Sequence, residues 1–189
     1  MSQDLSQCSD GELAVFALGG QESAYREFLR RYREPVYRLV RGTIRDGEEA
    51  LDVTQESFIA AFAALKRYDR ERPFKLWISR IAINKCRDWA RRRAVRAFFI
   101  RAAPIDDAFQ LASDAASPET EAADRAELVR VNAAIAKIPA NLREALVLRA
   151  IEGMTQAEAA ETLGVTEKTV ETRLYRARLK LEELLIKKN

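Results

Sequence analysis

The stretch TQAEAAETLGVTEKTVETRLYRARLKL, residues 155–181, predicts two short helices joined by a tight turn. Thr155 followed three residues later by Glu158 has the spacing of a capping box, which starts a helix by satisfying its first backbone N–H groups. Gly164 supplies the left-handed residue with which helices commonly end, and Thr166 is suited to cap the next helix. Two capped helices in this order around a glycine form the layout of a helix-turn-helix.

The second of these helices has an apolar side and a polar side. The apolar side, which should pack on the preceding helix, contains Val170, Leu174, Ala177 and Leu181. The polar side, at least a quarter-turn away, contains Thr169, Thr172, Arg173, Arg176 and Lys180. Arginine can bind guanine edges in a fork, whereas threonine and lysine suit thymine methyl groups and phosphates. An isolated basic helix is more often simply solvated, but within a helix-turn-helix this side indicates DNA binding.

The composition favours an all-α protein and argues against several functional classes. With 7 Gly and 5 Pro in 189 residues, the chain has little material for the many turns of a β-protein. The sequence contains no His, and Cys8 and Cys86 are too few ligands for the usual zinc sites. No segment resembles a membrane span or a signal peptide, so we expect a cytoplasmic protein with free thiols and no membrane insertion. The absence of His also removes the commonest general base and weakens an enzymatic interpretation.

Charge is distributed unevenly along the chain. Residues 25–97 contain 19 Lys and Arg against 10 Asp and Glu, and residues 129–189 contain 11 against 8. Between them, residues 98–128 carry 2 basic and 7 acidic side chains. Two basic helical blocks on either side of an acidic connector predict two contacts with one polyanion, such as DNA.

The N-terminal part begins with two predicted helices. Ser9 and Glu12 form a second capping box, and the short helix that they start should stop at the glycine pair 19–20. A longer helix follows with Pro35 inside its apolar pattern. Because proline removes one helical hydrogen bond and clashes with the preceding turn, we expect it to kink or split this helix.

A third helix is predicted over residues 48–65. Its broad apolar side contains Leu51, Phe58, Ile59, Phe62 and Leu65. Asp52, Gln55 and Glu56 form a polar patch on the same helix. These are either ordinary solvated residues near a helix N-terminus or a docking surface for a protein, and spacing alone does not decide between the two.

A charged loop, residues 68–73, precedes a long basic helix. The core side of that helix contains Phe74, Ile78, Ile81, Ala82, Cys86 and Trp89. The opposite side contains Arg80, Asn84, Arg87, Asp88 and Arg91. Trp77 falls at the edge between the two sides, where a partly buried core role and a role in stacking on exposed bases both stay open.

Helical periodicity is lost after residue 97, which indicates a domain boundary. Residues 98–125 gather prolines, serines and acids, and we expect a flexible acidic linker whose aromatic residues dock on another surface: Phe98, Phe99 and Phe109. Helical patterns resume over residues 126–138 and 141–153 and should complete a core with the last two helices. The predicted domains are therefore residues 1–97 and 126–189.

Three ordered stretches of the chain resemble one family, the extracytoplasmic-function sigma factors of bacterial RNA polymerase. The sequence DVTQESF, residues 52–58, resembles that family's core-polymerase-binding motif. The sequence FKLWISRIAIN, residues 74–84, resembles its promoter-melting helix, which reads the minus-ten element. Residues 138–174 resemble its C-terminal domain. The likeness covers roughly residues 9–97 and 126–186.

The resemblance implies an all-α architecture of two small domains joined by a flexible linker. The first would be the family's region-two helical bundle, and the second its region-four helix-turn-helix. The resemblance also implies a subunit that directs promoter-specific initiation of transcription, with no catalysis and no cofactor of its own. The implied partners are core RNA polymerase, through its β′ clamp helices and β flap, promoter DNA, and an anti-sigma factor that holds the chain inactive in a stress response.

Site residues are implied by their positions in these motifs. Those implied for polymerase binding are Asp52, Gln55, Glu56, Phe58 and Phe62. Those implied for the minus-ten element, with the loop 68–73 capturing a flipped base, are Tyr68, Arg72, Trp77, Arg80, Asn84, Arg87, Asp88 and Arg91. Those implied for the minus-thirty-five duplex are Lys168, Thr169, Thr172, Arg173, Arg176 and Lys180. Glu171 stands where the family usually has lysine and Lys168 where it often has glycine, which leaves the base preference open.

Three other functional classes are weaker alternatives. A stand-alone helix-turn-helix regulator would share residues 155–181, but the sequence has no sustained heptad or sensor domain to support dimerisation. An interaction adaptor would leave both basic helical faces unused. An enzyme is least favoured, because no nucleophile, metal cluster or phosphate-binding loop emerges from the sequence.

Overall fold

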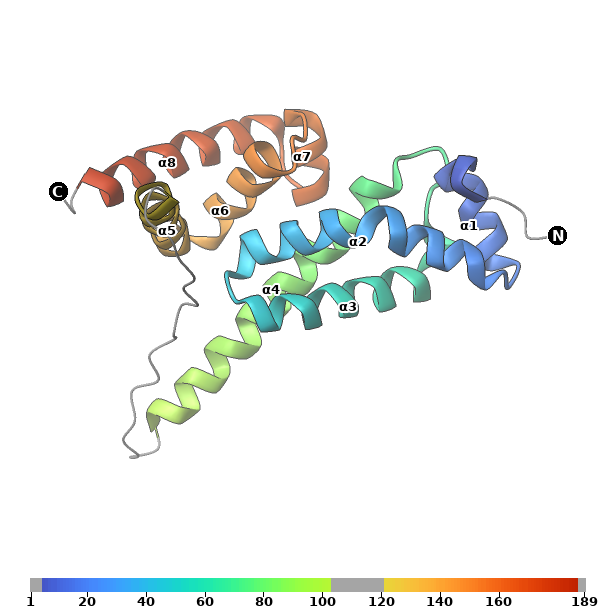
Figure 1. Cartoon of the computed structure of the whole chain (residues 1–189), viewed down its shortest axis with the longest axis horizontal. Coiled ribbons are helices and arrows are strands. Elements are labelled where there is room, and N and C mark those ends of the chain that lie inside the picture. The colour runs from blue at the N-terminus through green and yellow to red at the C-terminus, as the bar shows by residue number, and fades with distance from the viewer. Residues whose placement is uncertain (1–4, 103–120, 187–189) are drawn as a thin grey trace.

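The computed structural model describes residues 5–102 and 121–186, and the elements in these ranges are helices (Figure 1). The N-terminal unit, residues 5–102, contains η1 (Leu5–Gln7), α1 (Asp10–Leu18), α2 (Glu22–Ile44), α3 (Gly47–Ala63), η2 (Leu65–Arg67) and α4 (Phe74–Ala102). The C-terminal unit, residues 121–186, contains α5 (Glu121–Lys137), α6 (Ala140–Leu146), the π-helical turn η3 (Val147–Ile151), α7 (Gln156–Leu163) and α8 (Glu167–Ile186). The predicted all-α fold is confirmed. Within these two ranges, no helix has the length and apolar content of a membrane span.

The N-terminal unit is a bundle in which α2, α3 and α4 pack together and α1 packs on α2. The rings of Phe28 and Phe74 stack at its centre, with centroids 4.2 Å apart and no exposed surface. At the start of α1, the Ser9 hydroxyl accepts a hydrogen bond from the Glu12 N–H, and the Glu12 carboxylate accepts one from the Ser9 N–H. The predicted capping box is therefore confirmed, and it fixes where α1 begins.

Pro35 does not split α2, which is one helix of 23 residues. The prediction of a split is wrong, because the residues that follow Pro35 are held by the core. Val36, Leu39 and Val40 are at most 2% exposed. Burying three such side chains contributes more than the roughly 3 kcal/mol that a proline costs inside a helix.

The apolar side of α3 is narrower than its sequence predicts. Phe58 and Leu65 are buried as expected, but Leu51 is 48% exposed and Ile59 is 69% exposed. The buried side of α3 instead uses small residues, Ala50, Val53 and Ala61, which let the helix approach α2 and α4 closely. Leu51 and Ile59 are thus left on a surface that faces away from the core of this unit.

Helix α4 continues to Ala102, past the predicted start of the linker at residue 98, and extends beyond the ends of α2 and α3 (Figure 1). Phe98 and Phe99 lie on this extension, 71% and 67% exposed, with their rings 5.9 Å apart. Both rings are exposed in the described part of the chain, and their docking on a partner stays a prediction. Helix α5 starts at Glu121, earlier than predicted, and Phe109 lies outside the described residues.

The C-terminal unit contains the predicted helix-turn-helix. The capping box of Thr155 and Glu158 starts α7, and Gly164, with φ of 67°, ends it in the left-handed conformation. Thr166 accepts a hydrogen bond from the Thr169 N–H and so caps α8. Val170 and Ala177 are fully buried, as the apolar pattern of α8 predicts.

The two units pack against each other, a point that the sequence leaves open. Helix α7 contacts α4, and the turn η3 contacts α2. Buried residues of both units form one continuous hydrophobic cluster, in which Val147 of η3 faces Gly42 of α2. A Cβ atom at Gly42 would lie 3.1 Å from a methyl carbon of Val147, so glycine permits this close approach.

Candidate nucleic-acid interface

A pocket of about 230 Å³ lies where the loop 68–73 meets α4 and α7. From the residues predicted to bind the minus-ten element, its lining includes Tyr68, Arg72, Trp77 and Arg80. The sequence places these residues on a loop and on two turns of α4, and the fold brings them to one cavity. From the C-terminal unit, Glu161 and Thr162 complete the lining.

Tyr68 is the fixed wall of this pocket. It is only 5% exposed, and its hydroxyl donates a hydrogen bond to the carbonyl oxygen of Arg72, which closes the loop on itself. Its ring lies 5.3 Å from that of Phe74 and 5.2 Å from that of Trp77. Burial, with smaller effects of the Asp10 and Asp69 charges, raises the pKa of Tyr68 to about 12, so the hydroxyl stays protonated and able to donate.

The other residues predicted for the minus-ten element lie farther along α4. Arg80 and Asn84 are exposed, Arg87 and Asp88 are half-buried, and Arg91 is exposed and ion-paired with Asp88. They form one polar side of the helix, as predicted. Of these five residues, Arg80 lines the pocket, and Asn84, Arg87, Asp88 and Arg91 lie outside it.

Two of the arginines predicted to bind the minus-ten element form ion pairs with the C-terminal unit. Arg87 binds Glu144 of α6 in a fork, with Nε–Oε1 and Nη2–Oε2 distances of 2.9 and 2.7 Å, and these hydrogen bonds raise the pKa of Arg87. Arg72 is ion-paired with Glu161 of α7. In this arrangement, glutamates of the C-terminal unit hold groups that the sequence assigns to DNA.

Further contacts between the units involve Glu152, at the end of η3. Its carboxylate is 2% exposed and lies 3.6 Å from Nε of Arg38 in α2, while its carbonyl oxygen accepts a hydrogen bond of 3.0 Å from Lys75. Burial raises the pKa of Glu152, and the nearby charges of Arg38 and Lys75 oppose that rise. Each of these contacts joins a basic side chain of the N-terminal unit to an oxygen atom of the C-terminal unit.

Helix α8 displays only part of its predicted reading side. Lys168, Arg176 and Lys180 are exposed, whereas Thr169, Thr172 and Arg173 are half-buried. Lys168 is ion-paired with Glu171, and Lys180 with Glu183. The Thr172 hydroxyl donates to the carbonyl oxygen of Lys168, and one terminal nitrogen of Arg173 is buried without a hydrogen-bond partner.

The residues predicted to bind polymerase divide into surface and core. Asp52 and Gln55 are exposed, and Glu56 is half-buried between Lys85 and Arg92, at 3.6 and 3.4 Å. Phe58 is 4% exposed, so its ring lies in the core and not on the surface where the prediction put it. Phe62 is half-buried and packs its ring edge against Tyr25, with centroids 4.9 Å apart. The two phenylalanines therefore hold α3 in place, and Asp52 and Gln55 are left on its exposed surface.

A groove of about 920 Å³ runs between α2 and α3 beside Gln55, and most of its lining was missed by sequence reasoning. The lining residues of α2 are Arg26, Leu29, Arg30, Arg33, Glu34 and Tyr37, and those of α3 are Leu51, Thr54 and Gln55. The signal in the sequence was the spacing of the three arginines, which places them on one side of a helix. The sequence reading of α2 considered only its apolar residues.

The exposed end of α4 forms a second basic surface. It carries Arg91, Arg92, Arg93 and Arg96, all exposed. Trp89 lies beneath them, with its indole N–H donating to Glu49 at 2.7 Å and the Arg93 guanidinium 5.1 Å from its ring. Across the part of the chain that the structure describes, no three His, Cys, Asp or Glu side chains gather as a metal site would require.

Comparison with known proteins places this geometry in a family. Residues 28–96 match the family described as Sigma-70 region 2, and residues 128–181 match Sigma-70, region 4. The chain is 39% identical to the RNA polymerase sigma factor CnrH of Cupriavidus metallidurans, over 94% of each chain. It is 32% identical to the ECF RNA polymerase sigma factor SigM of Mycobacterium tuberculosis, over 94% of this chain and 85% of that one.

A solved structure agrees with the sequence comparisons. The structure of CnrH in complex with the cytosolic domain of CnrY superposes with a TM-score of 0.70 at 34% identity, over 95% of this chain and 99% of that one. The chain therefore belongs to the extracytoplasmic-function group of the sigma-70-type sigma factors of bacterial RNA polymerase.

Proposed function

We propose that this chain binds core RNA polymerase in the cytoplasm and directs it to promoters, without catalysing a reaction itself. It takes an unpaired base of the minus-ten element into the pocket beside the loop 68–73 and reads the minus-thirty-five duplex with α8. One observation carries this proposal: Tyr68, Arg72, Trp77 and Arg80 converge on one pocket at the start of a basic helix.

The chemistry of the pocket suits an extruded base. Aromatic rings provide stacking surfaces for bases of any identity, and Tyr68 and Trp77 form such a wall. Arg72 and Arg80 supply donors that can reach base edges or phosphates. Since flipping a base costs a few kcal/mol of lost stacking, a pocket that stabilises only some bases provides selectivity.

On the helix-turn-helix, Arg176 is the residue best placed for base contact, because it is exposed and carries no ion pair among the described contacts of α8. Replacing it by alanine should weaken binding of the minus-thirty-five duplex by about 1–3 kcal/mol if the guanidinium binds guanine in a fork. Arg178 is equally exposed but lies on the other side of α8, so Arg178→Ala is the matched control.

Binding of the minus-ten strand requires the two units to separate. In this structure the guanidinium groups of Arg72 and Arg87 bind Glu161 and Glu144, and a phosphate would compete with these glutamates for their N–H donors. Promoter engagement therefore includes breaking these pairs. Core polymerase, by holding the units apart, supplies the free energy for this step.

The polymerase-binding surface in this proposal consists of Asp52 and Gln55 with the neighbouring groove of α2 and α3. Leu51, which lines that groove and is 48% exposed, provides its apolar contact. Leu51→Ser should reduce recovery of core polymerase in a pull-down at unchanged thermal stability. Val15→Ser is the control, because Val15 is 47% exposed on α1, away from the groove.

We also propose that a protein inhibitor of the anti-sigma type controls this chain. The support is the likeness to the solved complex of CnrH with the cytosolic domain of CnrY, which covers 95% of this chain. Such an inhibitor would compete with polymerase for the surfaces just named.

Run-off transcription on a random-promoter library tests the proposed function directly. Purified core polymerase should produce new starts that share two spaced sequence motifs only when this chain is added. Arg80→Ala should abolish the downstream motif preference, and Arg176→Ala should weaken the upstream one. If no new starts arise and the isolated chain binds duplex operators tightly, the protein is a stand-alone regulator and the proposal is wrong.

A further inference from the structure

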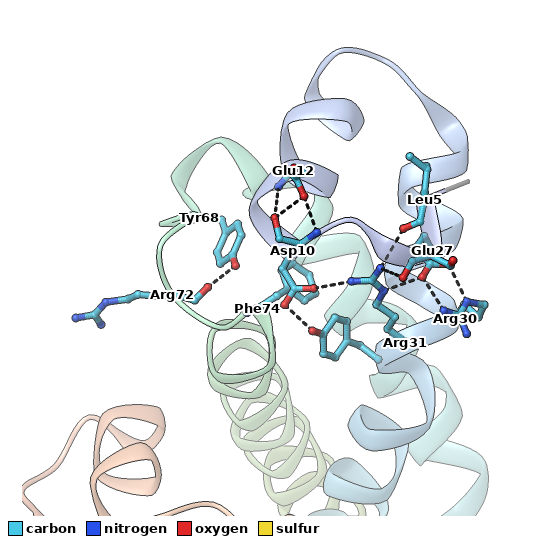
Figure 2. A network of polar contacts seen from close by, with 12 residues as sticks. Leu5, Asp10, Glu12, Glu27, Arg30, Arg31, Tyr68, Arg72 and Phe74 are labelled. Atoms are coloured by element: carbon cyan, nitrogen blue, oxygen red, sulfur yellow. Dashed lines mark hydrogen bonds and ion pairs between the residues drawn. The ribbon is translucent and has the colours of Figure 1, made fainter. Parts of the chain in front are cut away.

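The carboxylate of Asp10 joins three elements of the N-terminal unit (Figure 2). Its Oδ1 accepts a hydrogen bond from Arg31 at 3.3 Å, and its Oδ2 accepts one from the Tyr32 hydroxyl at 2.5 Å and one from the Phe74 N–H at 3.3 Å. Asp10 is the first residue of α1, Arg31 and Tyr32 belong to α2, and Phe74 is the first residue of α4. One side chain therefore fixes the start of α4 relative to the two preceding helices.

The surroundings hold this carboxylate in place. The side chains of Asp10 and Arg31 are each 19% exposed. Arg31 is itself held by Glu27, at 2.7 Å, and donates to the carbonyl oxygens of Leu5 and Ser6 at 3.1 and 2.9 Å. Figure 2 shows Arg31 between Asp10 and Glu27 and bonded to both. Asp10 is thus part of an anchored charge network, and hydrogen bonds from a rigid network position their acceptor well.

The bond from Phe74 has a specific consequence for the pocket. The first N–H groups of a helix have no partner inside the helix, and here an aspartate 64 residues away accepts one of them. The ring of Phe74 lies 5.3 Å from Tyr68 and 5.4 Å from Trp77, the two aromatic walls of the pocket. Fixing the backbone of Phe74 therefore fixes the rings against which a base would stack.

A second contact from α1 reaches the middle of the loop. A Cβ atom at Gly11 would lie 2.9 Å from the carbonyl oxygen of Arg70 and 3.3 Å from its Cβ. Real Cβ atoms do not approach a backbone oxygen so closely, so the loop lies directly on the backbone of α1, and glycine is required there. Helix α1 thus touches the loop at Arg70, and it also binds Phe74, the first residue of α4 after the loop.

We propose that α1 sets the shape of the loop 68–73 and that Asp10 is the positioning residue through which it does so. By this route α1, which lies outside the matched residues 28–96, determines which base the pocket accepts from single-stranded DNA. This inference rests on the proposed function of the pocket. It assigns to α1 a role in promoter specificity and not only in stability.

The test compares two substitutions that change the contacts of α1 with Phe74 or with the loop, and one control substitution elsewhere on α1. Asp10→Asn keeps the size of the side chain but removes the charge that binds Arg31 and Phe74. Gly11→Ala displaces Arg70 without changing any charge. Leu13→Ala is the control for lost stability, because Leu13 is fully buried on α1 and its truncation leaves both the Asp10 carboxylate and Gly11 unchanged.

Two measurements on the full chain are needed. The first is the affinity of the complex with core polymerase for single-stranded oligonucleotides that differ at one position of the minus-ten element. Asp10→Asn should reduce the preference for the best base about tenfold, as expected when a hydrogen bond to a charged group is weakened. Gly11→Ala should reduce the same preference, because the added methyl group displaces Arg70 in the loop. Leu13→Ala should leave that preference unchanged. The second is amide hydrogen exchange of the free chain, in which Asp10→Asn should speed exchange at Phe74 and in the loop.

The outcomes separate this inference from the proposed function. If the wild-type complex discriminates between bases and Asp10→Asn leaves the discrimination intact, Asp10 is purely structural and the inference is wrong. If Leu13→Ala reduces discrimination as much as Asp10→Asn at equal loss of stability, the inference is equally wrong. A wild-type complex that binds polymerase but shows no base preference at any position refutes the proposed function of the pocket itself. Should Asp10→Asn not fold, Gly11→Ala alone decides, because it carries the same expectation.

Discussion

The ion pair of Arg87 with Glu144 allows a sharp prediction about how the two units hold together. Arg87 lies on α4 and Glu144 on α6, 57 residues apart, and they form a fork of two hydrogen bonds. The pair is strongly asymmetric in burial: the side chain of Glu144 is 4% exposed and that of Arg87 is 37% exposed. The two alanine substitutions should therefore have very different effects on stability.

Arg87→Ala leaves a buried carboxylate without its partner. Such a change costs about 3–5 kcal/mol, and the positive charge of neighbouring Arg143 places the expected value near the lower end, about 3 kcal/mol. Glu144→Ala leaves a half-exposed guanidinium that reaches water and already lies 3.4 Å from Asn84, so about 1 kcal/mol is expected. The double variant should be only slightly less stable than Glu144→Ala, which gives a coupling energy of about 3 kcal/mol, the two single losses together less the loss in the double variant.

Urea unfolding of the four full-length proteins, followed by circular dichroism, measures these values directly. Equal losses of unfolding free energy in Arg87→Ala and Glu144→Ala would show that the burial of the residue left behind does not control the loss of stability. A coupling energy below about 0.5 kcal/mol would mean that the fork contributes nothing specific, and the reasoning would be refuted.

The remaining predictions concern acid stability, the core, the glycine turn and the thiols. Hydrogen bonds from Arg30 lower the pKa of Glu27 from 4.5 to about 2, so its ionised form stabilises the fold above pH 4.5, and this contribution is lost as the pH falls from 4.5 toward 2. Glu27→Gln should flatten that part of the stability profile, and an unchanged profile would contradict the assignment. Phe74→Ala should cost about 3–5 kcal/mol in urea unfolding, because a fully buried ring is removed. Gly164→Ala should cost about 1–2 kcal/mol, since alanine is strained at a φ of 67°; a neutral effect would show that the turn relaxes. Burial raises the pKa of the Cys86 thiol to about 12, so a thiol reagent should label the half-buried Cys8 first and Cys86 only on unfolding.

The local features of this fold could be predicted from the sequence because they depend on residues close together in the chain. The capping boxes at Ser9 and Thr155 and the turn at Gly164 are set by residues within three or four positions of one another. The helix-turn-helix followed from them. The basic side of α4 could likewise be predicted, because helical spacing alone places its residues together.

The errors arose where contacts over long sequence distances decide the outcome. Spacing showed that α3 has an apolar side but not how wide it is, so Leu51 and Ile59 were assigned to a core that does not reach them. Phe58 was assigned to a binding surface, because a motif does not reveal which of its members point inward. Pro35 was expected to kink or split its helix, and the split is wrong because packing keeps the helix whole.

The candidate site shows the same division. Asp10 is an acid in the first turn of a helix, and nothing near it in the sequence points to Phe74. The convergence of Glu144 and Glu161 on arginines of the other unit was equally invisible, since each pair joins residues more than 50 positions apart. Motifs in the sequence pointed to residues of the pocket. They did not point to the distant residues that hold the pocket and its arginines in place, Asp10, Glu144 and Glu161.

The pairing of arginines with glutamates across the two units has a consequence for measurements of DNA binding. Salt weakens phosphate contacts, and for single strands each contact contributes about 0.7 to the slope of log affinity against log salt concentration. The pairs of Arg72 with Glu161 and of Arg87 with Glu144 are also weakened by salt, and these glutamates compete with phosphate for the same guanidinium groups. Rising ionic strength thus lowers the affinity for DNA and at the same time lowers the cost of opening the protein. For the free chain, the measured slope of log affinity against log salt concentration will therefore be shallower than its number of phosphate contacts predicts. A count of phosphate contacts taken from that slope will miss the arginines that are paired with glutamates inside the protein.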